Sequence, residues 1–252
     1  MLVVDFMHEF ELGVWKAIFI HLIRILVAHG GDAVQQLNQR YRMVPTFGRS
    51  TIRRFTNNAS AMKKLAARNY EDLLQCAIPV FEGLLPEPYN KDILDLLFLL
   101  GYWHSLAKLR MHTTFSLARL DEVTSSLGRQ IRYFAKRTCS KFETKELPSE
   151  EAARGRRKAR KAAAKAKKTG RAASPPSPTE KDSSKKSKFK LFNLLTYKGH
   201  SLGDYVRTIR FLGTTDSYST QPVCLRFTLE HLLTFLGRDG TPAPESLLPT
   251  HQ

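Results

Sequence analysis

The sequence predicts a mainly α protein, an irregular cluster of helices joined to a long disordered basic linker. Three observations predict this class. Apolar residues recur every three or four positions over most of residues 1–142, no stretch alternates with a period of two, and a Lys- and Arg-rich segment with no apolar face follows. With 252 residues, of which 42% are hydrophobic, the chain is long enough to bury the core of one domain.

The first predicted helix extends from about residue 5 to residue 29. Trp15, Phe19 and Leu22 recur at helical spacing on one face, so this face is expected to be buried. Asp5 occupies the position where a capping acid is favoured, and Gly30 follows the last periodic residue, where a glycine commonly ends a helix.

Further helices follow from the same spacing. The segment at 93–107 is apolar on most sides and is expected to be the centre of the core, while Pro86-Glu87-Pro88 marks a break before it. Pro79 is expected to kink or divide the helix in which it lies, and Asn57 begins the segment that caps that helix. The other predicted helices cover residues 32–42, 62–77, 115–134, 189–211 and 225–236.

The excess positive charge is concentrated in one segment. Between Arg154 and Lys190 there are 15 Lys and Arg side chains against two acids, a net +13 of the chain's +17. The composition around Ser174-Pro175-Pro176 is typical of disorder. The predicted organisation is a helical domain at 1–142, a disordered basic linker at 143–188, a small, loosely docked helical appendage at 189–236 and a disordered tail at 237–252.

Other features exclude whole classes of protein. Cys76, Cys139 and Cys224 are an odd set without Cys-x-x-Cys spacing, which argues against a disulfide framework and a structural zinc site. The longest apolar stretches, 12–28 and 93–107, are interrupted by charged residues and are too short to cross a membrane. A soluble, intracellular protein without a membrane partner is therefore expected.

The N-terminal acids and a histidine are the best chemical candidates. Asp5, His8 and Glu9, with Glu11 as a further member, would lie on adjacent helical turns and supply mixed oxygen and nitrogen ligands to a divalent cation. The alternative is an ordinary helix start, where acids are favoured by the helix dipole. His104 is interpreted as a core or surface histidine, and no spacing indicates a catalytic triad or a phosphate-binding loop.

The basic segment is a candidate phosphate-binding tether or nuclear-import signal, or simply a solvated charged segment. It contains no interleaved aromatic residue, so any binding to DNA is expected to be electrostatic and sensitive to salt. The candidate DNA-binding residues are Arg154, Arg156, Arg157, Lys158, Arg160, Lys161, Lys165, Lys167 and Lys168.

The run from Asp5 to Lys16 resembles a stretch of transposase-derived proteins abundant in mushroom-forming fungi, the Kyakuja–Dileera–Zisupton and Plavaka-like assemblage of DDE transposases. Four later stretches are similar to the same proteins, and the resemblance covers residues 1–221. These stretches are 41–67, 72–88, 147–156 and 197–221.

The resemblance implies DNA cut-and-paste chemistry on an RNase H-like fold, in which three carboxylates hold two Mg²⁺ ions. Asp5-Phe6-Met7-His8 fits a Cys/Asp-x-x-His element of a helical insertion, so both catalytic Asp residues would precede Met1. The family pattern continues after Gln221 into a run containing Glu-x-x-His. In this sequence only Glu230-His231 partly matches that run. The family-motif candidates for catalysis are therefore Asp5, His8 and Glu230.

These expectations combine into a fragment of the helical insertion of an RNase H-like transposase, without a complete carboxylate set and without an intrinsic cofactor. Residual non-specific DNA association through the basic linker is expected, together with self-association through apolar surface left bare. The alternative is a helical interaction module recruited by the host, and a third interpretation is a nuclease completed by another chain. The expected location is the nucleus, with the cytoplasm as the alternative.

Overall fold

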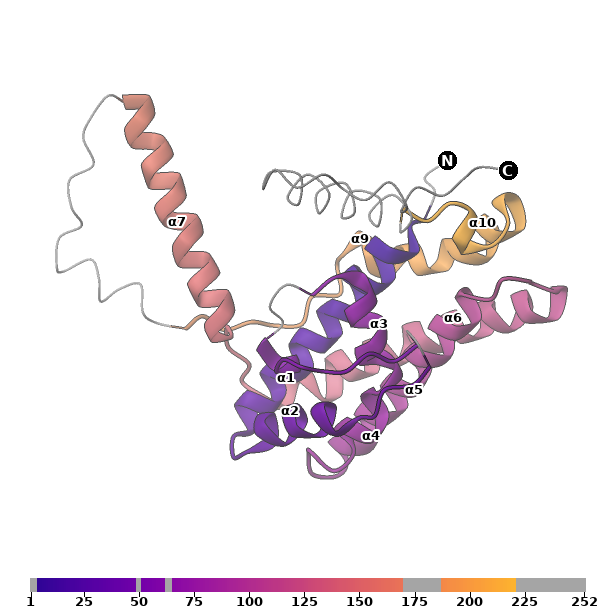
Figure 1. The fold of residues 1–252 in the computed structure, drawn as a ribbon, viewed down its shortest axis with the longest axis horizontal. Helices are drawn as coiled ribbons and strands as arrows, with labels where there is room; N and C mark the ends of the chain where they lie inside the picture. Colours follow the sequence, from indigo (N-terminus) through magenta and orange to yellow (C-terminus); the bar gives the residue numbers. More distant parts are fainter. Residues whose placement is uncertain (1–3, 49–50, 62–64, 170–186, 221–252) are drawn as a thin grey trace, which may run out of the picture.

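A computed structural model of the protein describes residues 4–48, 51–61, 65–169 and 187–220 (Figure 1). Its regular structure is helical, which confirms the predicted α class. These residues form no β-strand; two isolated bridges join Phe47 to Ile52 and Lys145 to Phe189. In chain order the longer helices are η1 (Phe6–Trp15), α1 (Lys16–His29), α2 (Ala33–Met43), α3 (Ala67–Gln75), α4 (Ala77–Phe81), α5 (Tyr89–Ala107), α6 (Thr114–Arg137), α7 (Pro148–Thr169) and α10 (Tyr205–Leu212). Shorter turns are η2 (Ala59–Ala61), η3 (Cys139–Lys141), α9 (Tyr197–His200), η4 (Ser201–Asp204) and η5 (Thr215–Ser217).

The first helix begins at Asp5, as predicted, and the Asp5 carboxylate accepts a hydrogen bond from the Met7 amide at 3.2 Å. Its first ten residues, η1, form a π-helix, the helix type characterised by bonds between residues five apart, and α1 continues it without a gap. The apolar spacing in the sequence does not distinguish this π-helix from an α-helix. The helix ends at Gly30, whose φ of 86° glycine adopts without strain.

Helices α5 and α6 form an antiparallel hairpin that carries the centre of the core. The Trp103 indole donates to Thr124 Oγ1 at 2.8 Å, and Gln130 Nε2 donates to the Asp92 carbonyl near the opposite end of the pair. Trp103 and Trp15 are fully buried, and the burial of Trp15 confirms that the predicted apolar face of the first helix packs into the core. The break at residues 86–88 and the predicted helix at 93–107 are also confirmed.

The helix predicted over 62–77 begins later in the structure than the sequence predicts. A short 3₁₀ turn, η2, follows Asn57, and α3 begins only at Ala67. The chain is divided at Cys76, and Pro79 lies in the first turn of α4. Pro79 has no amide hydrogen to donate to the Gln75 carbonyl, so this division agrees with the effect predicted for the proline.

The C-terminal described segment belongs to the main core and is not a loosely docked appendage. The ring of Tyr205, in α10, is fully buried and meets the Trp103 ring edge-on with centroids 4.9 Å apart. Thr215 Oγ1 donates to the Ala107 carbonyl at 3.0 Å. The apolar face of α10 needs this contact with α5 and η1 to be removed from water.

The structure also differs from the expected disordered linker. Residues 148–169 form the helix α7, which projects away from the other helices (Figure 1). Glu150 and Leu147 attach the start of this helix to the body, which the basic composition of the segment does not reveal. Residues 170–186, Glu230, the predicted helix at 225–236 and the predicted tail at 237–252 lie outside the described residues.

Within the described ranges, no helix combines the length and the apolarity that a membrane crossing requires.

Candidate functional site

Asp5 and His8 meet at the start of η1, as the sequence predicts. His8 Nδ1 lies 2.5 Å from Asp5 Oδ2, and Thr220 Oγ1 donates to the same oxygen at 2.6 Å. Burial raises the pKa of Asp5, but the hydrogen bond from Thr220 and the adjacent His8 outweigh it, so the pKa lies below its usual value. Asp5 is therefore an ionised carboxylate whose partners come from both ends of the described chain.

Glu9 does not join this pair. Its carboxylate is almost completely buried, and its Oε2 has no hydrogen-bond partner among the described residues. Burial raises the pKa of Glu9, so this side chain is more readily neutral than an exposed glutamate. Hence Asp5, His8 and Glu9 do not converge on a common point.

The described residues do not fit a two-metal centre at Asp5. Such a centre needs several carboxylates around the two ions. Over the described ranges, the one group of three His, Cys or acidic residues with all ligand atoms within 4.8 Å of one another is a different one, formed by Glu11, Glu71 and His104. No catalytic step through Mg²⁺ follows from the Asp5–His8 pair.

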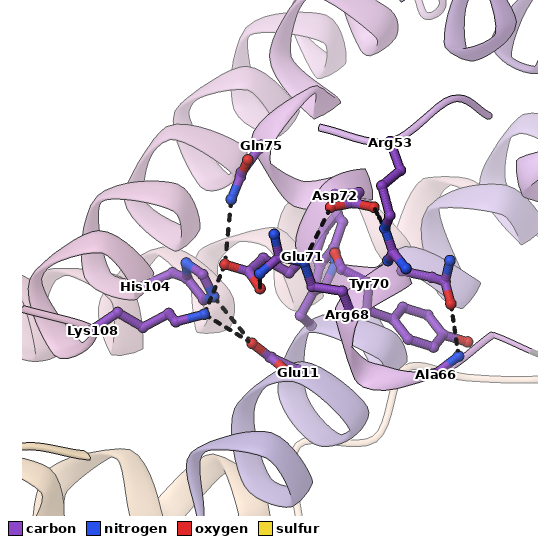
Figure 2. A network of polar contacts seen from close by, with 12 residues as sticks. Glu11, Arg53, Ala66, Arg68, Tyr70, Glu71, Asp72, Gln75, His104 and Lys108 are labelled. Atoms are coloured by element: carbon purple, nitrogen blue, oxygen red, sulfur yellow. Dashed lines mark hydrogen bonds and ion pairs between the residues drawn. The ribbon is translucent and has the colours of Figure 1, made fainter. Parts of the chain in front are cut away.

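The group at Glu11, Glu71 and His104 is buried between three helices (Figure 2). Glu11 comes from η1, Glu71 from α3 and His104 from α5, and all three are less than 9% exposed. His104 Nε2 lies 3.4 Å from Glu11 Oε1. The Lys108 ammonium, at the C-terminal end of α5, donates to Glu71 Oε1 at 2.7 Å and lies 3.9 Å from Glu11 Oε1.

Neighbouring polar residues hold Glu71 in place. Arg68 Nη1 donates to Glu71 Oε2 at 3.2 Å and Gln75 Nε2 to Oε1 at 3.3 Å. Burial raises the pKa of Glu71, but the hydrogen bond and charge of Lys108 outweigh it, so the pKa lies below its ordinary value. The next residue, Asp72, accepts a hydrogen bond from Arg53 at 2.9 Å, yet burial still raises its pKa (Figure 2).

A second feature is the basic surface of α7. Arg154, Arg157, Lys158 and Lys161 follow the i, i+3, i+4, i+7 spacing of one helix face. They line a groove of about 700 Å³. Its lining residues are Glu146, Glu150, Ala153, Arg154, Arg157, Lys158, Lys161, Lys188 and Lys190.

The two acids in this groove are already engaged by cations. Glu146 accepts from Arg154 at 3.0 Å and pairs with Lys190 at 3.5 Å. Glu150 forms a two-point contact with Arg24 of α1, at 3.1 and 2.5 Å. Arg157, Lys158 and Lys161 are exposed and form no ion pair with any residue in the described ranges. The groove therefore has a net positive surface.

The opposite wall of the groove is held by the backbone. The Glu146 amide donates to the Lys188 carbonyl at 2.8 Å, and the Lys190 amide donates to the Thr144 carbonyl at 2.9 Å. These bonds place Lys188 and Lys190 opposite α7. Of the other predicted DNA-binding residues, Arg156 and Arg160 lie on the reverse face of the helix, and Lys165, Lys167 and Lys168 belong to its last turns.

Comparisons with models of known protein families, with curated proteins and with solved structures gave no match to this chain. The site geometry is thus the basis for a functional conclusion.

Sequence reasoning found the basic residues and the Asp5–His8 pair but missed the buried group. From the sequence, Glu11 is only a further member of the N-terminal cluster, and His104 is interpreted as a core or surface histidine. The available signal is that each is a polar residue within an apolar run, between Phe10 and Leu12 and after Trp103. Glu71 lies far from both in the sequence, so no spacing rule joins the three.

Proposed function

We propose that this chain is a transposase-derived protein without catalytic activity of its own that binds DNA non-specifically through α7. The observation that carries the proposal is the anchored basic groove. Arg157, Lys158 and Lys161 present three charges on one face that are unpaired within the described ranges, and Lys188 faces them across the groove. Positive side chains at this density bind phosphate oxygens and release the counterions condensed on DNA.

The shape of α7 favours contact with the phosphate backbone rather than with bases. The groove-lining residues include no aromatic side chain on which a base would stack. The helix is attached by Glu150 to α1, so its charges keep a defined direction. A helix held in this way loses less conformational entropy on binding than a free basic tail does.

The decisive experiment measures binding of the full chain to a labelled DNA duplex by fluorescence anisotropy, in salt from roughly 50 to 200 mM. A variant with glutamine at eight basic positions of α7 keeps the helix propensity and removes the charge. We expect its binding to be nearly lost. The eight positions are Arg156, Arg157, Lys158, Arg160, Lys161, Lys165, Lys167 and Lys168.

Two double variants separate the groove from the overall charge. Arg157→Gln with Lys161→Gln alters the groove face, and Arg156→Gln with Arg160→Gln alters the reverse face by the same charge. The groove pair should weaken binding more and lower the slope of log K against log salt by about two. DNA binding that survives the eight-site change would show that other helices bind DNA, and would contradict the proposal.

The absence of catalysis is proposed on the Asp5–His8 geometry. A carboxylate held by one histidine and one threonine provides no pair of metal positions for water activation. We expect the purified chain with Mg²⁺ or Mn²⁺ to leave duplex DNA uncut. Cleavage that disappears in Asp5→Ala would contradict this part of the proposal.

A second candidate function is that of a nuclear protein-interaction module, favoured by the segment after the groove. Leu191 is 87% exposed and Leu195 is 88% exposed, and Tyr197 follows with half of its surface in water. Apolar side chains this exposed are typical of association surfaces. If this segment mediates self-association, Leu191→Ser with Leu195→Ser should abolish concentration-dependent sedimentation. If α7 is also a nuclear-import signal, a fluorescent fusion of the parent should accumulate in the nucleus, and a fusion of the eight-site variant should not.

A further inference from the structure

The charge of Glu11 is poorly compensated in its surroundings. The side chain is 1% exposed, and its Oε2 is buried without a hydrogen-bond partner in the described residues. Its Oε1 has only His104 at 3.4 Å and the Lys108 ammonium at 3.9 Å within those ranges. A carboxylate removed from water is costly unless a cation or several donors contact it closely. Glu11 thus requires a closer positive partner than the three helices supply.

The Lys108 ammonium lies closer to Glu71 than to Glu11. It is 2.7 Å from Glu71, which also has Arg68 and Gln75, so Glu71 is surrounded by donors and Glu11 is not. One ammonium shared unevenly between two buried carboxylates leaves local negative charge beside a histidine. This combination of two carboxylates and an imidazole is the ligand type of Zn²⁺ and related divalent transition ions.

We propose that Glu11, Glu71 and His104 form a binding site for a divalent transition metal ion of the Zn²⁺ class, which displaces the Lys108 ammonium when it binds. The ligand atoms all lie within 4.8 Å of one another. Ligands at about 2.1 Å from a tetrahedral ion are roughly 3.4 Å apart. The 3.4 Å between His104 Nε2 and Glu11 Oε1 already matches this edge, and the Glu71 carboxylate lies within 4.8 Å of both ligands.

The position of Lys108 allows its ammonium to move out of the site when an ion binds. Lys108 lies at the C-terminal cap of α5, and its side chain is 24% exposed, whereas those of Glu11 and His104 are almost completely buried. The flexible stem can therefore carry the ammonium into water while the ligands remain. The incoming ion brings two positive charges in place of one, which compensates the Glu11 carboxylate more fully than the shared ammonium does.

Two structural features favour a built site over a chance cluster. The His104 ring packs against both Phe6 and Phe10, with centroids 5.1 and 5.4 Å away, and its Nε2 lies 3.4 Å from Glu11 Oε1. Glu11 itself lies on the ten-residue π-helix η1, a helix type that is rare and occurs frequently at functional sites. The ion would link η1, α3 and α5, and its role is therefore to stabilise the helical core, independently of DNA binding.

The test uses the full chain, freed of metal with a chelator and titrated with Zn²⁺ by calorimetry, together with thermal unfolding and the visible spectrum of Co²⁺. We expect one ion per chain, a higher unfolding temperature and the intense bands of four-coordinate Co²⁺. Glu11→Gln should weaken Zn²⁺ binding by more than about a hundredfold, since a direct ligand matters at least as much as its supports. Glu122→Gln, on the surface of α6, is the charge-matched control and should bind normally.

Removal of the Lys108 charge tests separately whether its ammonium competes with the ion. Lys108→Gln should tighten Zn²⁺ binding by about tenfold, because a competing charge near the site is removed. Lys91→Gln, at the exposed start of the same helix, should leave the affinity unchanged. If Glu11→Gln fails to fold, the Zn²⁺ affinities of the Lys108 and Lys91 variants still test whether the ion binds beside Lys108. Absence of Zn²⁺ binding in both the parent and Lys108→Gln would overturn the proposal, as would binding that is lost only in Asp5→Asn with His8→Gln.

Discussion

Lys198 lies against Gly13, the glycine of the π-helix η1. A Cβ added at Gly13 would come within 2.6 Å of Lys198 Cδ and within 2.8 Å of the His8 carbonyl oxygen. The Lys198 ammonium donates to that same carbonyl at 2.8 Å. Thus the missing side chain at residue 13 allows α9 to close over the first helix, and it connects the C-terminal described segment to the N-terminal candidate residues.

Substitution of Gly13 tests this contact. Gly13→Ala should lower the free energy of unfolding by about 1–3 kcal/mol, because the added methyl group meets backbone as well as a side chain. Gly101→Ala, in α5, is the matched control, since a methyl group added there would meet no atom within 4 Å among the described residues. It should stabilise by about 0.5–1 kcal/mol through helix propensity. Urea unfolding monitored by circular dichroism measures both, and equal effects would contradict the close approach.

The pair between Arg24 and Glu150 is predicted to hold the start of α7. Arg24→Gln removes both contacts to Glu150, and amide hydrogen exchange at residues 150–153 should then accelerate by about tenfold, a local loss near 1.4 kcal/mol. Arg42→Gln, exposed at the end of α2, should leave this exchange unchanged. Equal exchange rates in the parent and in Arg24→Gln would show that Leu147 and the backbone bonds suffice.

The same anchor should depend on pH. Burial raises the pKa of Glu150, but the hydrogen bonds from Arg24 and from the Leu147 amide outweigh it and place the pKa below the ordinary 4.5. A depressed carboxylate pKa contributes stability that is fully present above the unfolded pKa and is lost as pH falls through the folded pKa. The protection factor of the amides at the start of α7, which corrects for the intrinsic pH dependence of exchange, should therefore fall below about pH 4.5 in the parent, with a weaker response in Arg24→Gln.

The helices that could be predicted from sequence are those whose own apolar spacing determines them. α5 and α6 are long, and each buries a regular face against the other, so their bounds agree with the predictions to within a few residues. The order in α7 depends on Glu150, whose partner Arg24 is 126 residues away, and local composition carries no sign of that pairing.

The candidate sites also differ in whether local sequence spacing is enough to predict them. Asp5 and His8 are three residues apart on one helix, so their contact follows from helix geometry. The Glu11–Glu71–His104 group needs three helices to be packed correctly, and His104 is 93 residues from Glu11. Nor does any local pattern reveal the π-helix that carries Glu11, since the apolar stripe fits either helix type.

His21 should make stability fall in mild acid. Its side chain is 1% exposed, and burial, with a smaller contribution from the nearby Arg24, lowers its pKa from 6.5 to about 4, although Glu150 acts in the opposite direction. The unfolded chain then binds a proton between these values and the folded chain does not, so stability is lost as pH falls below 6.5. We expect a loss of about 1 kcal/mol between roughly pH 7 and pH 5.5. His29→Gln, an exposed change on the same helix, should preserve this dependence in urea unfolding.

Replacing His21 by an apolar residue should stabilise the protein. Neither His21 Nδ1 nor Nε2 has a hydrogen-bond partner within the described residues, and the ring packs against Phe134 and Phe192 with centroids 6.3 and 5.1 Å away. His21→Leu removes two unpaired polar atoms from an apolar setting at similar volume, so the free energy of unfolding should rise by about 1 kcal/mol near neutral pH. The gain should grow to about 2 kcal/mol near pH 5.5, because the variant no longer loses stability through protonation of the unfolded histidine. Urea unfolding at both pH values measures this difference. A destabilised variant, or one with the same gain at both pH values, would mean that His21 makes a favourable polar contact in solution and that its imidazole is not held neutral by burial.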